Sequence, residues 1–361
     1  MGCNNSRIQW PTDTSFNTSQ LEQLRTLHQY LYEDSSSNMR FRSLFAIPDF
    51  PDFGMCIKRF IGSGMWIEFV KRIEILIYGN HCTTPITFNS VTLISHILSN
   101  ENEEQIVAVL IACIGAPIEV IDFVLPSPRG SLDSLANHLR RHFPILFTAF
   151  QKLIFSKIFG GKLKFHSEIS SDSGRVNDCL DVLRLTDYNI YSSTKFHPLY
   201  LSHSKLSFHS LITALFSYSG PCILLVETAQ NYKLGAFIPI SIRKISNSPR
   251  SADIFLFSFA AGFHTFRTFE GYGGKNYINL HIEDDKYTGL GFGGKSSEQA
   301  RLWLDVQIES KSYVSEFCDT YRPGPLIPQS TGKYWLPITS IQVWGLESSS
   351  TPVFASLKYE D

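Results

Sequence analysis

The stretch GLGFGGKSSEQARLWLD, residues 289–305, decides between two different folds. Its first eight residues fit the phosphate-binding pattern G-x-x-x-x-G-K-[ST], with Gly289, Gly294, Lys295 and Ser296 in the required places. Such a loop works because backbone N–H groups at a strand-to-helix turn wrap the phosphates. The strand before it is a buried parallel strand, and its sequence is therefore almost continuously apolar.

The residues on both sides of these glycines have the pattern of antiparallel strands instead. Residues 276–288, NYINLHIEDDKYT, alternate polar and apolar, as expected for a strand with one wet face. From Leu302 to Ile308 the apolar residues again fall at every second position. We therefore predict a glycine-rich connection between antiparallel strands. A nucleotide hydrolase that uses Lys295 and Ser296 stays as an alternative.

The rest of the C-terminal half points the same way. One helix is predicted over residues 205–218. After it come short β-rich runs with turn residues between them: CILLVE, KLGAFIPI, DIFLFSF, TFRTF, NYINLHIE, RLWLDVQIE and ITSIQVWGL. Many short strands without alternating helices indicate an antiparallel β-sandwich and not a parallel sheet.

Residues 19–165 have the spacing of helices. The pairs Ser19–Glu22 and Asn100–Glu103 have capping-box spacing, and Ser131 can cap a third helix. The segment PILFTAFQKLIFSKIF (144–159) predicts one buried helix that ends at Gly160. No segment fits the EF-hand loop, so an EF-hand-like helix-loop-helix form could persist here only without calcium ligands.

The fold class is therefore α+β, with an all-helical domain over residues 19–165 and a β-sandwich flanked by helices after it. Residues 166–197 are polar and irregular, and they read as a linker with one short helix near Leu180.

Composition excludes several function classes. The 361 residues carry a net charge of −1, so nothing suggests a nucleic-acid partner. The seven cysteines are scattered singly, without metal-ligand spacing or a disulfide framework. G-x-S-x-G and H-E-x-x-H are both missing from the sequence. We expect no enzyme, no metal and no cofactor.

The first residues, MGCNNSR, carry a separate motif. They match M-G-x-x-x-[ST], which predicts myristoylation of Gly2. Cys3 is placed for a palmitoyl group, and a second acyl chain turns marginal membrane binding into stable binding. Residues 1–18 are therefore expected to be an acylated, flexible N-terminus.

From about Pro198 onward the chain resembles the TLDc domain, the module of oxidation-resistance-type and V-ATPase-associated proteins. PCILLVETAQNYKLGAF is similar to the first β-hairpin of that family, and FEGYGGKNYINL to its aromatic-glycine-asparagine stretch. GLGFGGKSSEQARLWLD resembles the glycine cluster before a Leu-Trp-Leu-Asp strand, and FCDTYRPGPL and IQVWGL resemble later signatures. We therefore expect a TLDc domain over residues 198–361. The layout looks most like that of the N-myristoylated lysosomal and vacuolar members.

The resemblance also suggests residues for protein contacts. The candidates are Glu227, Glu270, Gly273, Gly274, Gly289, Gly291, Gly293, Gly294 and Asp305. The glycines are expected to supply backbone conformations or close approach, and the carboxylates exposed contacts. Trp303, Trp344 and Phe237 are expected in the core.

The family implies a non-enzymatic protein that binds the V-ATPase, regulates its assembly or disassembly, and contributes to oxidative stress resistance. The acylation motif implies the cytoplasmic face of lysosomal, vacuolar or other endomembranes, with a cytosolic pool. Besides the hydrolase, a second alternative is a cytosolic oxidative-stress factor without contact to the pump.

Overall fold

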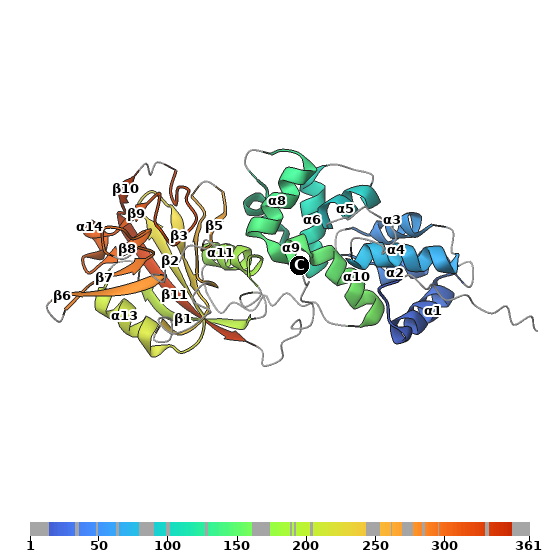
Figure 1. Ribbon diagram of the computed structural model, residues 1–361, viewed down its shortest axis with the longest axis horizontal. Coiled ribbons are helices and arrows are strands. Elements are labelled where there is room, and N and C mark those ends of the chain that lie inside the picture. Colours follow the sequence, from blue (N-terminus) through green and yellow to red (C-terminus); the bar gives the residue numbers. More distant parts are fainter. Residues whose placement is uncertain are drawn as a thin grey trace, which may run out of the picture. The chain divides into compact units, whose positions relative to one another are not determined.

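The protein folds into two compact units, residues 1–165 and 166–361, which are described separately (Figure 1). The computed structural model describes residues 14–32, 36–47, 50–62, 65–78, 90–98, 102–126, 129–160, 174–187, 190, 193–202, 205–242, 253–260, 262–268, 277–283, 286–294, 296–328 and 332–348. The N-terminal motif with Gly2 and Cys3 lies outside these residues.

The first unit is helical, as predicted. Its helices are α1 (Thr18–Tyr32), α2 (Ser37–Leu44), α3 (Phe53–Ile61), α4 (Trp66–Tyr78), α5 (Ser90–Leu98), α6 (Glu103–Ile114), the 3-10 turn η1 (Ile118–Val120), α7 (Ile121–Val124), α8 (Leu132–His142), α9 (Pro144–Phe147) and α10 (Ala149–Phe159). α6 is deeply buried, and its residues Ile106, Val107, Val109 and Leu110 are fully inaccessible to solvent. No described helix has the length and apolar sequence needed to cross a membrane.

Two predicted helix starts were wrong by two residues. The capping box of α1 is made by Asn17 and Gln20, whose side chains each accept the other's backbone N–H at 3.0 Å. α6 is capped by Asn102, whose Oδ1 accepts the N–H groups of Glu104 and Gln105 at 2.9 and 3.2 Å. Both errors have one cause, because residues that cap well lie close together: Asn17 near Ser19, and Asn102 near Asn100.

Two other helix boundaries follow the sequence more closely. Ser131 caps α8, with Oγ accepting the N–H of Ser134 at 3.3 Å. Gly160 ends α10 with a φ of 81°, which only glycine adopts without strain. The segment expected to be one helix is divided at Thr148 into α9 and α10. The Thr148 hydroxyl donates to Pro144 O at 3.2 Å and so competes with the backbone ladder.

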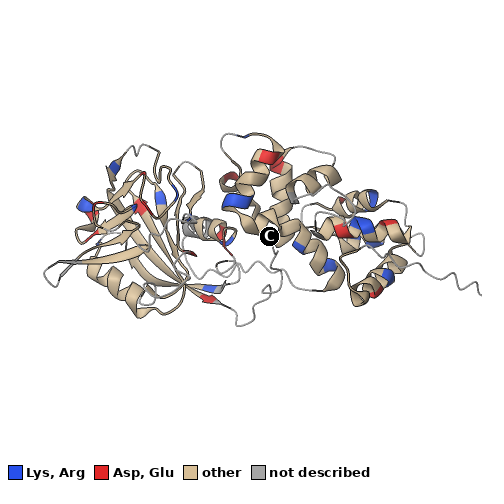
Figure 2. Ribbon diagram, viewed as in Figure 1, with Lys and Arg blue, Asp and Glu red and all other residues tan. Residues whose placement is uncertain are grey.

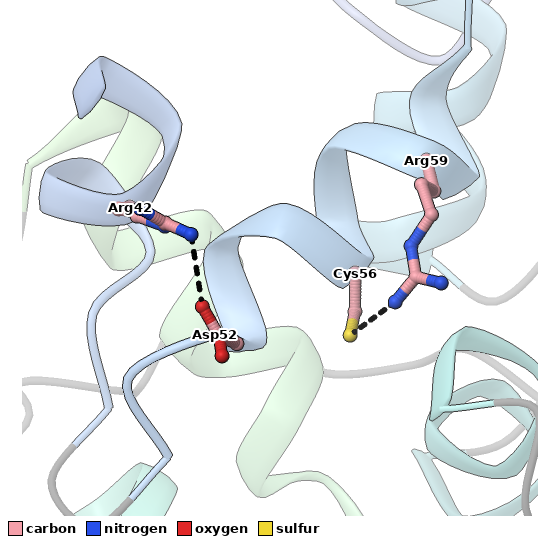
Figure 3. A network of polar contacts seen from close by, with 4 residues as sticks. All are labelled: Arg42, Asp52, Cys56 and Arg59. Carbon is pink, nitrogen blue, oxygen red and sulfur yellow. Dashed lines mark hydrogen bonds and ion pairs between the residues drawn. The ribbon is translucent and has the colours of Figure 1, made fainter. Parts of the chain in front are cut away.

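Polar side chains make contacts at the connection between α2 and α3 and along α3 (Figure 3). Asp52 occupies the N-cap position of α3 but makes no side-chain cap bond. Its carboxylate instead pairs with Arg42 of α2 at 3.2 Å. Further along α3, Arg59 donates from Nη2 to Cys56 Sγ at 3.1 Å. The exposed Arg42–Asp52 pair adds little stability, but it links two short helices.

The second unit contains two antiparallel sheets, as predicted. The first has the order β1-β11-β2-β3-β4-β5 and the second β10-β9-β8-β7-β6. The strands are β1 (Ser193–Ser202), β2 (Cys222–Thr228), β3 (Lys233–Ile238), β4 (Phe255–Ser258), β5 (His264–Phe266), β6 (Ile278–Glu283), β7 (Lys286–Phe292), β8 (Leu302–Asp305), β9 (Tyr313–Ser315), β10 (Lys333–Trp335) and β11 (Ile338–Ser348). The helices are α11 (Gly174–Arg184), α13 (Phe208–Ser217) and α14 (Ile308–Lys311).

The core lies between the inner faces of the two sheets. Leu224, Val226 and Leu234 of the first sheet join Leu290 and Leu304 of the second in one buried cluster. α13 adds to the same cluster its buried apolar residues Phe208, Leu211, Ile212 and Leu215. Phe237 and Trp344 are also buried, as predicted, on the opposite face of the first sheet. This sheet is therefore apolar on both faces.

The structure differs from our prediction at the start of this unit. We expected residues 166–197 to be a linker with one short helix near Leu180; that helix is α11, but α11 and the first half of β1 are part of the folded unit. Leu180 and Leu183 of α11 are fully buried, and the guanidinium of Arg184 lies 4.6 Å from the ring centroid of Phe196 in β1. The polar sequence around these few apolar residues hid their contribution to the core.

The glycine-rich stretch also differs in one respect. Residues 286–292 form β7, a strand paired with both β6 and β8, so part of the expected connection is itself strand. In β8, the predicted alternation stops at Asp305, because Val306 is exposed and Ile308 begins α14. Glycine's low strand propensity concealed β7.

Candidate functional site

The outer face of the second sheet is organised around Trp303. This residue stands opposite Gly291 of β7 on one side and Tyr313 of β9 on the other. Its indole lies across β7, so a Cβ added to Gly289 would come within 2.2 Å of Trp303 Cζ2. A Cβ on Gly291 would lie 3.3 Å from Cε3. These two glycines are therefore needed for close approach and not for an unusual backbone conformation.

Three aromatic residues stand side by side across this face: Trp303, Tyr313 and Trp335, on β8, β9 and β10. We call them the aromatic row. The Tyr313 and Trp335 rings meet edge to face with centroids 5.7 Å apart. Lys333 Nζ lies 3.8 Å from the Tyr313 centroid and 5.0 Å from that of Trp335. Trp303 and Tyr313 are buried, whereas Trp335 is 55% exposed at the sheet edge.

The turn after β7 differs from a phosphate-binding loop. Gly293 and Gly294 have φ values of 77° and 72°, the left-handed region that favours glycine. The N–H of Gly293 donates to Tyr277 O at 3.1 Å, so it is not directed at a ligand. Residues 296–299 form a turn that leads into β8, and a phosphate loop requires a helix here. Lys295 itself lies outside the described residues. The antiparallel strands and the turn give no support to the hydrolase.

The same turn closes over the aromatic row. Tyr313 Oη donates a hydrogen bond to Ser297 O, and Ala300 is fully buried against Trp303 and Tyr313. Burial raises the pKa of the Tyr313 phenol to about 12, and Glu298 adds to this effect. The phenol is therefore a neutral donor at physiological pH.

Arg301, directly before β8, links this strand to β9 and to the loop that follows β9. Its guanidinium is buried and donates to the carbonyls of Ser315 and Gly324. It also lies 5.2 Å from the ring centroid of Phe266. Burial lowers the pKa of Arg301 to about 10, against the opposing effects of Cys318 and Glu316. The group stays charged at neutral pH, where its carbonyl partners offset the cost of burial.

Asp305, which we predicted as a contact residue, makes hydrogen bonds within the domain. Its Oδ2 accepts the indole N–H of Trp303 at 3.1 Å. Its Oδ1 accepts the backbone N–H of Gln307 at 2.8 Å, where the chain turns into α14. Both carboxylate oxygens therefore accept hydrogen bonds at the end of β8. One of these bonds fixes the orientation of the Trp303 indole, and the other stabilises the turn into α14.

Of the other predicted residues, Glu227 does not lie on this face. Glu227 lies on β2 of the first sheet, opposite Ser340 and Lys233. Glu270, Gly273 and Gly274 lie outside the described residues. The structure thus gathers Gly289, Gly291, Gly293, Gly294 and Asp305 around Trp303 and leaves Glu227 elsewhere.

Comparison with known families decides the identity of this unit. Residues 176–347 match the TLDc domain. The C-terminal unit is a TLDc domain. No curated protein matches the chain. TLDc domains are associated with oxidation resistance and with the V-ATPase, and the family is generally non-enzymatic.

The described part of the TLDc domain has exposed aromatic residues at one edge of the second sheet. Among the described residues, no group of three or more His, Cys, Asp or Glu side chains could hold a metal ion. Acidic and basic side chains are interspersed over the ribbon in Figure 2. The exposed end of the aromatic row instead offers Trp335 with Lys333, and Phe317 close by in sequence to β9 is 61% exposed. Exposed aromatic residues of this kind are enriched in protein interfaces.

Sequence reasoning missed Trp335, Lys333 and Arg301. Lys333–Trp335 is only three residues long and gave no strand signal. Arg301 precedes the Leu-Trp-Leu-Asp strand directly, but a charged residue at that place reads as exposed. Only the cross-strand pairing shows what these residues contact.

Proposed function

We propose that this protein is a non-enzymatic, peripheral-membrane TLDc protein that binds the V-ATPase and regulates its assembly or disassembly. The observation that carries the proposal is the TLDc domain over residues 176–347. Its surface chemistry is compatible with this role, because the aromatic row ends in an exposed Trp335 and not in a set of catalytic groups.

We further propose that Gly2 and Cys3 are acylated and hold the protein on the cytoplasmic face of lysosomal, vacuolar or other endomembranes. The support is the sequence MGCNNSR, which combines a myristoylation pattern with an adjacent cysteine. Two acyl chains give stable membrane binding, whereas one gives only marginal binding. A role in oxidative stress resistance belongs to the same proposal, through the family.

The proposal is tested by affinity purification from native membranes. Wild type should retain V-ATPase subunits, and Trp335→Ala should retain several-fold less. The matched control is Tyr30→Ala, which removes an aromatic side chain of similar exposure from the helical unit. Gly2→Ala should shift the protein to the soluble fraction. If wild type retains no V-ATPase subunit but remains on membranes, the pump is not its partner. If wild type retains no V-ATPase subunit and is wholly soluble, the cytosolic stress factor is the better description.

A further inference from the structure

The two sheets of the C-terminal unit end in four edge strands, and three of them carry features that hinder the addition of another strand. β1 contains Pro198, which has no N–H, and its pairing with β11 has two register shifts. Beside β5, the N–H of Arg322 donates to Arg267 O at 2.9 Å, so another segment already bonds there. β6 has a register shift between His281 and Ile282. The fourth edge strand, β10, pairs with β9 in unbroken register.

The backbone of β10 directs two residues toward the edge of the sheet. The N–H of Leu336, directly after β10, donates to Ser312 O at 2.8 Å. Bonded and non-bonded pairs alternate in an antiparallel ladder, so the next bonds to β9 are those of Tyr334. The N–H and C=O groups of Lys333 and Trp335 therefore point away from β9. An edge of this kind is the place where an extended peptide adds to a sheet as a further strand.

The side chains at this edge favour one kind of strand. Trp335 is 55% exposed and forms the open end of the aromatic row. Its ring packs against that of Tyr313, with centroids 5.7 Å apart, so an added strand meets a fixed apolar surface. Lys333 Nζ lies 5.0 Å from the Trp335 centroid and brings a positive charge to the same face. A strand with an apolar side chain and a carboxylate two residues away complements both.

We propose that β10 binds an extended segment of a partner protein as a sixth strand of the second sheet. Backbone groups of Lys333 and Trp335 bond to this segment. An apolar side chain of the segment lies on the Trp335 indole, and a carboxylate two residues away pairs with Lys333. The inference rests on the proposed function for the identity of the partner, a V-ATPase subunit, and adds how that partner is held. Main-chain bonds supply affinity in such complexes, and side chains supply selectivity.

The test compares alanine and proline at position 335 in the full chain. Both substitutions remove the indole, but only proline also removes the N–H that points toward the added strand. Trp335→Pro should therefore bind V-ATPase about fivefold more weakly than Trp335→Ala, the effect of one hydrogen bond. Binding is measured by biolayer interferometry with detergent-solubilised, purified V-ATPase.

Leu201 in β1 provides the matched control. Its side chain is 49% exposed, and the alternation of bonded pairs directs its N–H away from β11 in the same way. Leu201→Ala and Leu201→Pro should both bind as wild type does. Lys333→Gln should bind more weakly than wild type at low salt and equally well at high salt, because salt screens the pair with the carboxylate.

Hydrogen exchange of the wild type tests the same contact without a substitution. In the free protein the amide of Tyr334 should exchange slowly and that of Trp335 rapidly, because only Tyr334 bonds to β9. Bound V-ATPase should slow exchange of the Trp335 amide at least about fivefold. This measurement decides the question even if Trp335→Pro does not fold.

The proposed function and this inference fail in different ways. If wild type binds the V-ATPase but the Trp335 amide still exchanges rapidly, and the proline and alanine variants bind equally well, strand addition is overturned while the V-ATPase contact stands. If wild type does not bind the V-ATPase, the proposed function fails and this inference with it. If sedimentation shows a wild-type dimer that Trp335→Pro converts to a monomer, the added strand comes from a second copy of the chain and the V-ATPase segment is overturned.

Discussion

Trp303 shows how one side chain fixes the residues around it. Its indole leaves no room for a side chain at position 289 and little room for one at position 291. The indole N–H donates to Asp305. Gly289 and Gly291, in the string that resembles a phosphate-binding loop, are thus explained by an aromatic ring on the next strand, β8. The glycines make room for carbon atoms of the protein itself, and no ligand is needed to account for Gly289 and Gly291.

Gly289→Ala should therefore be far more destabilising than Gly291→Ala. The new Cβ would lie 2.2 Å from Trp303 Cζ2 in the first case and 3.3 Å from Cε3 in the second. Overpacking of this kind costs about 1–3 kcal/mol, and we expect the upper end for position 289 and less than about 1 kcal/mol for position 291. Urea unfolding followed by tryptophan fluorescence measures both. Equal losses for the two variants would contradict the placement of the indole.

Tyr313 should give the TLDc domain a characteristic dependence on pH. Burial raises its pKa from 10 to about 12, so the folded state holds the proton more tightly than the unfolded state does. This contribution to stability is fully present below pH 10 and is lost as the pH rises from 10 to 12. Tyr313→Phe lacks the contribution and also the hydrogen bond to Ser297 O.

The variant should accordingly be less stable than wild type at pH 8, by about 1 kcal/mol for the hydrogen bond. The difference should narrow between pH 10 and pH 12, because only wild type loses the contribution of this phenol. Urea unfolding at pH 8, 10 and 11 measures the difference, and the other tyrosines titrate equally in both proteins. A difference that stays constant would show that Tyr313 ionises normally.

At the scale of elements, what could be predicted depended on whether a signal was local. The helices of the first unit and strands such as β2 and β11 follow from periodicity in a few neighbouring residues. β7 and β10 could not be recognised in this way, because glycines and a three-residue segment carry no period. These segments are strands because β7 pairs with β8 and β10 pairs with β9. The aromatic row exists only through that pairing, so the candidate site was predictable in its glycines and not in Trp335.

The cap of α6 offers a test at this scale. Asn102 Oδ1 accepts two backbone N–H groups at the start of a helix whose apolar residues are buried. Asn102→Ala should cost about 1 kcal/mol of the free energy of unfolding, measured by urea unfolding with far-UV circular dichroism. Asn102→Asp keeps the acceptor and adds a favourable charge at the helix N-terminus, so it should be at least as stable as wild type. An aspartate variant as weak as the alanine variant would show that the cap bond contributes nothing.

At the scale of the whole molecule, the TLDc domain depends on residues that precede its recognisable motifs. α11 ends in a segment whose Thr186 O accepts a hydrogen bond from Arg267 Nη2 at 2.8 Å. Asp187 Oδ2 lies 3.8 Å from Nη1 of Arg267, the residue that directly follows β5. Phe196 is buried in β1, which pairs with β11 from Ser193 to Ser202. Starting the domain at Pro198 would cut β1 in half and remove α11.

Two fragments separate these boundaries. Residues 166–361 contain the whole C-terminal unit, and we expect this fragment to be soluble and to unfold cooperatively. Residues 198–361 lack the buried residues of α11 together with Phe196, and β11 would lose half of its outer partner strand. Each large buried side chain that is lost exposes an apolar surface worth about 1.5–3 kcal/mol, which together exceeds the stability of a typical domain. The shorter fragment should therefore aggregate or lack near-UV circular dichroism. Equal melting temperatures for the two fragments would show that α11 and the start of β1 are dispensable, and that the domain begins where its motifs do.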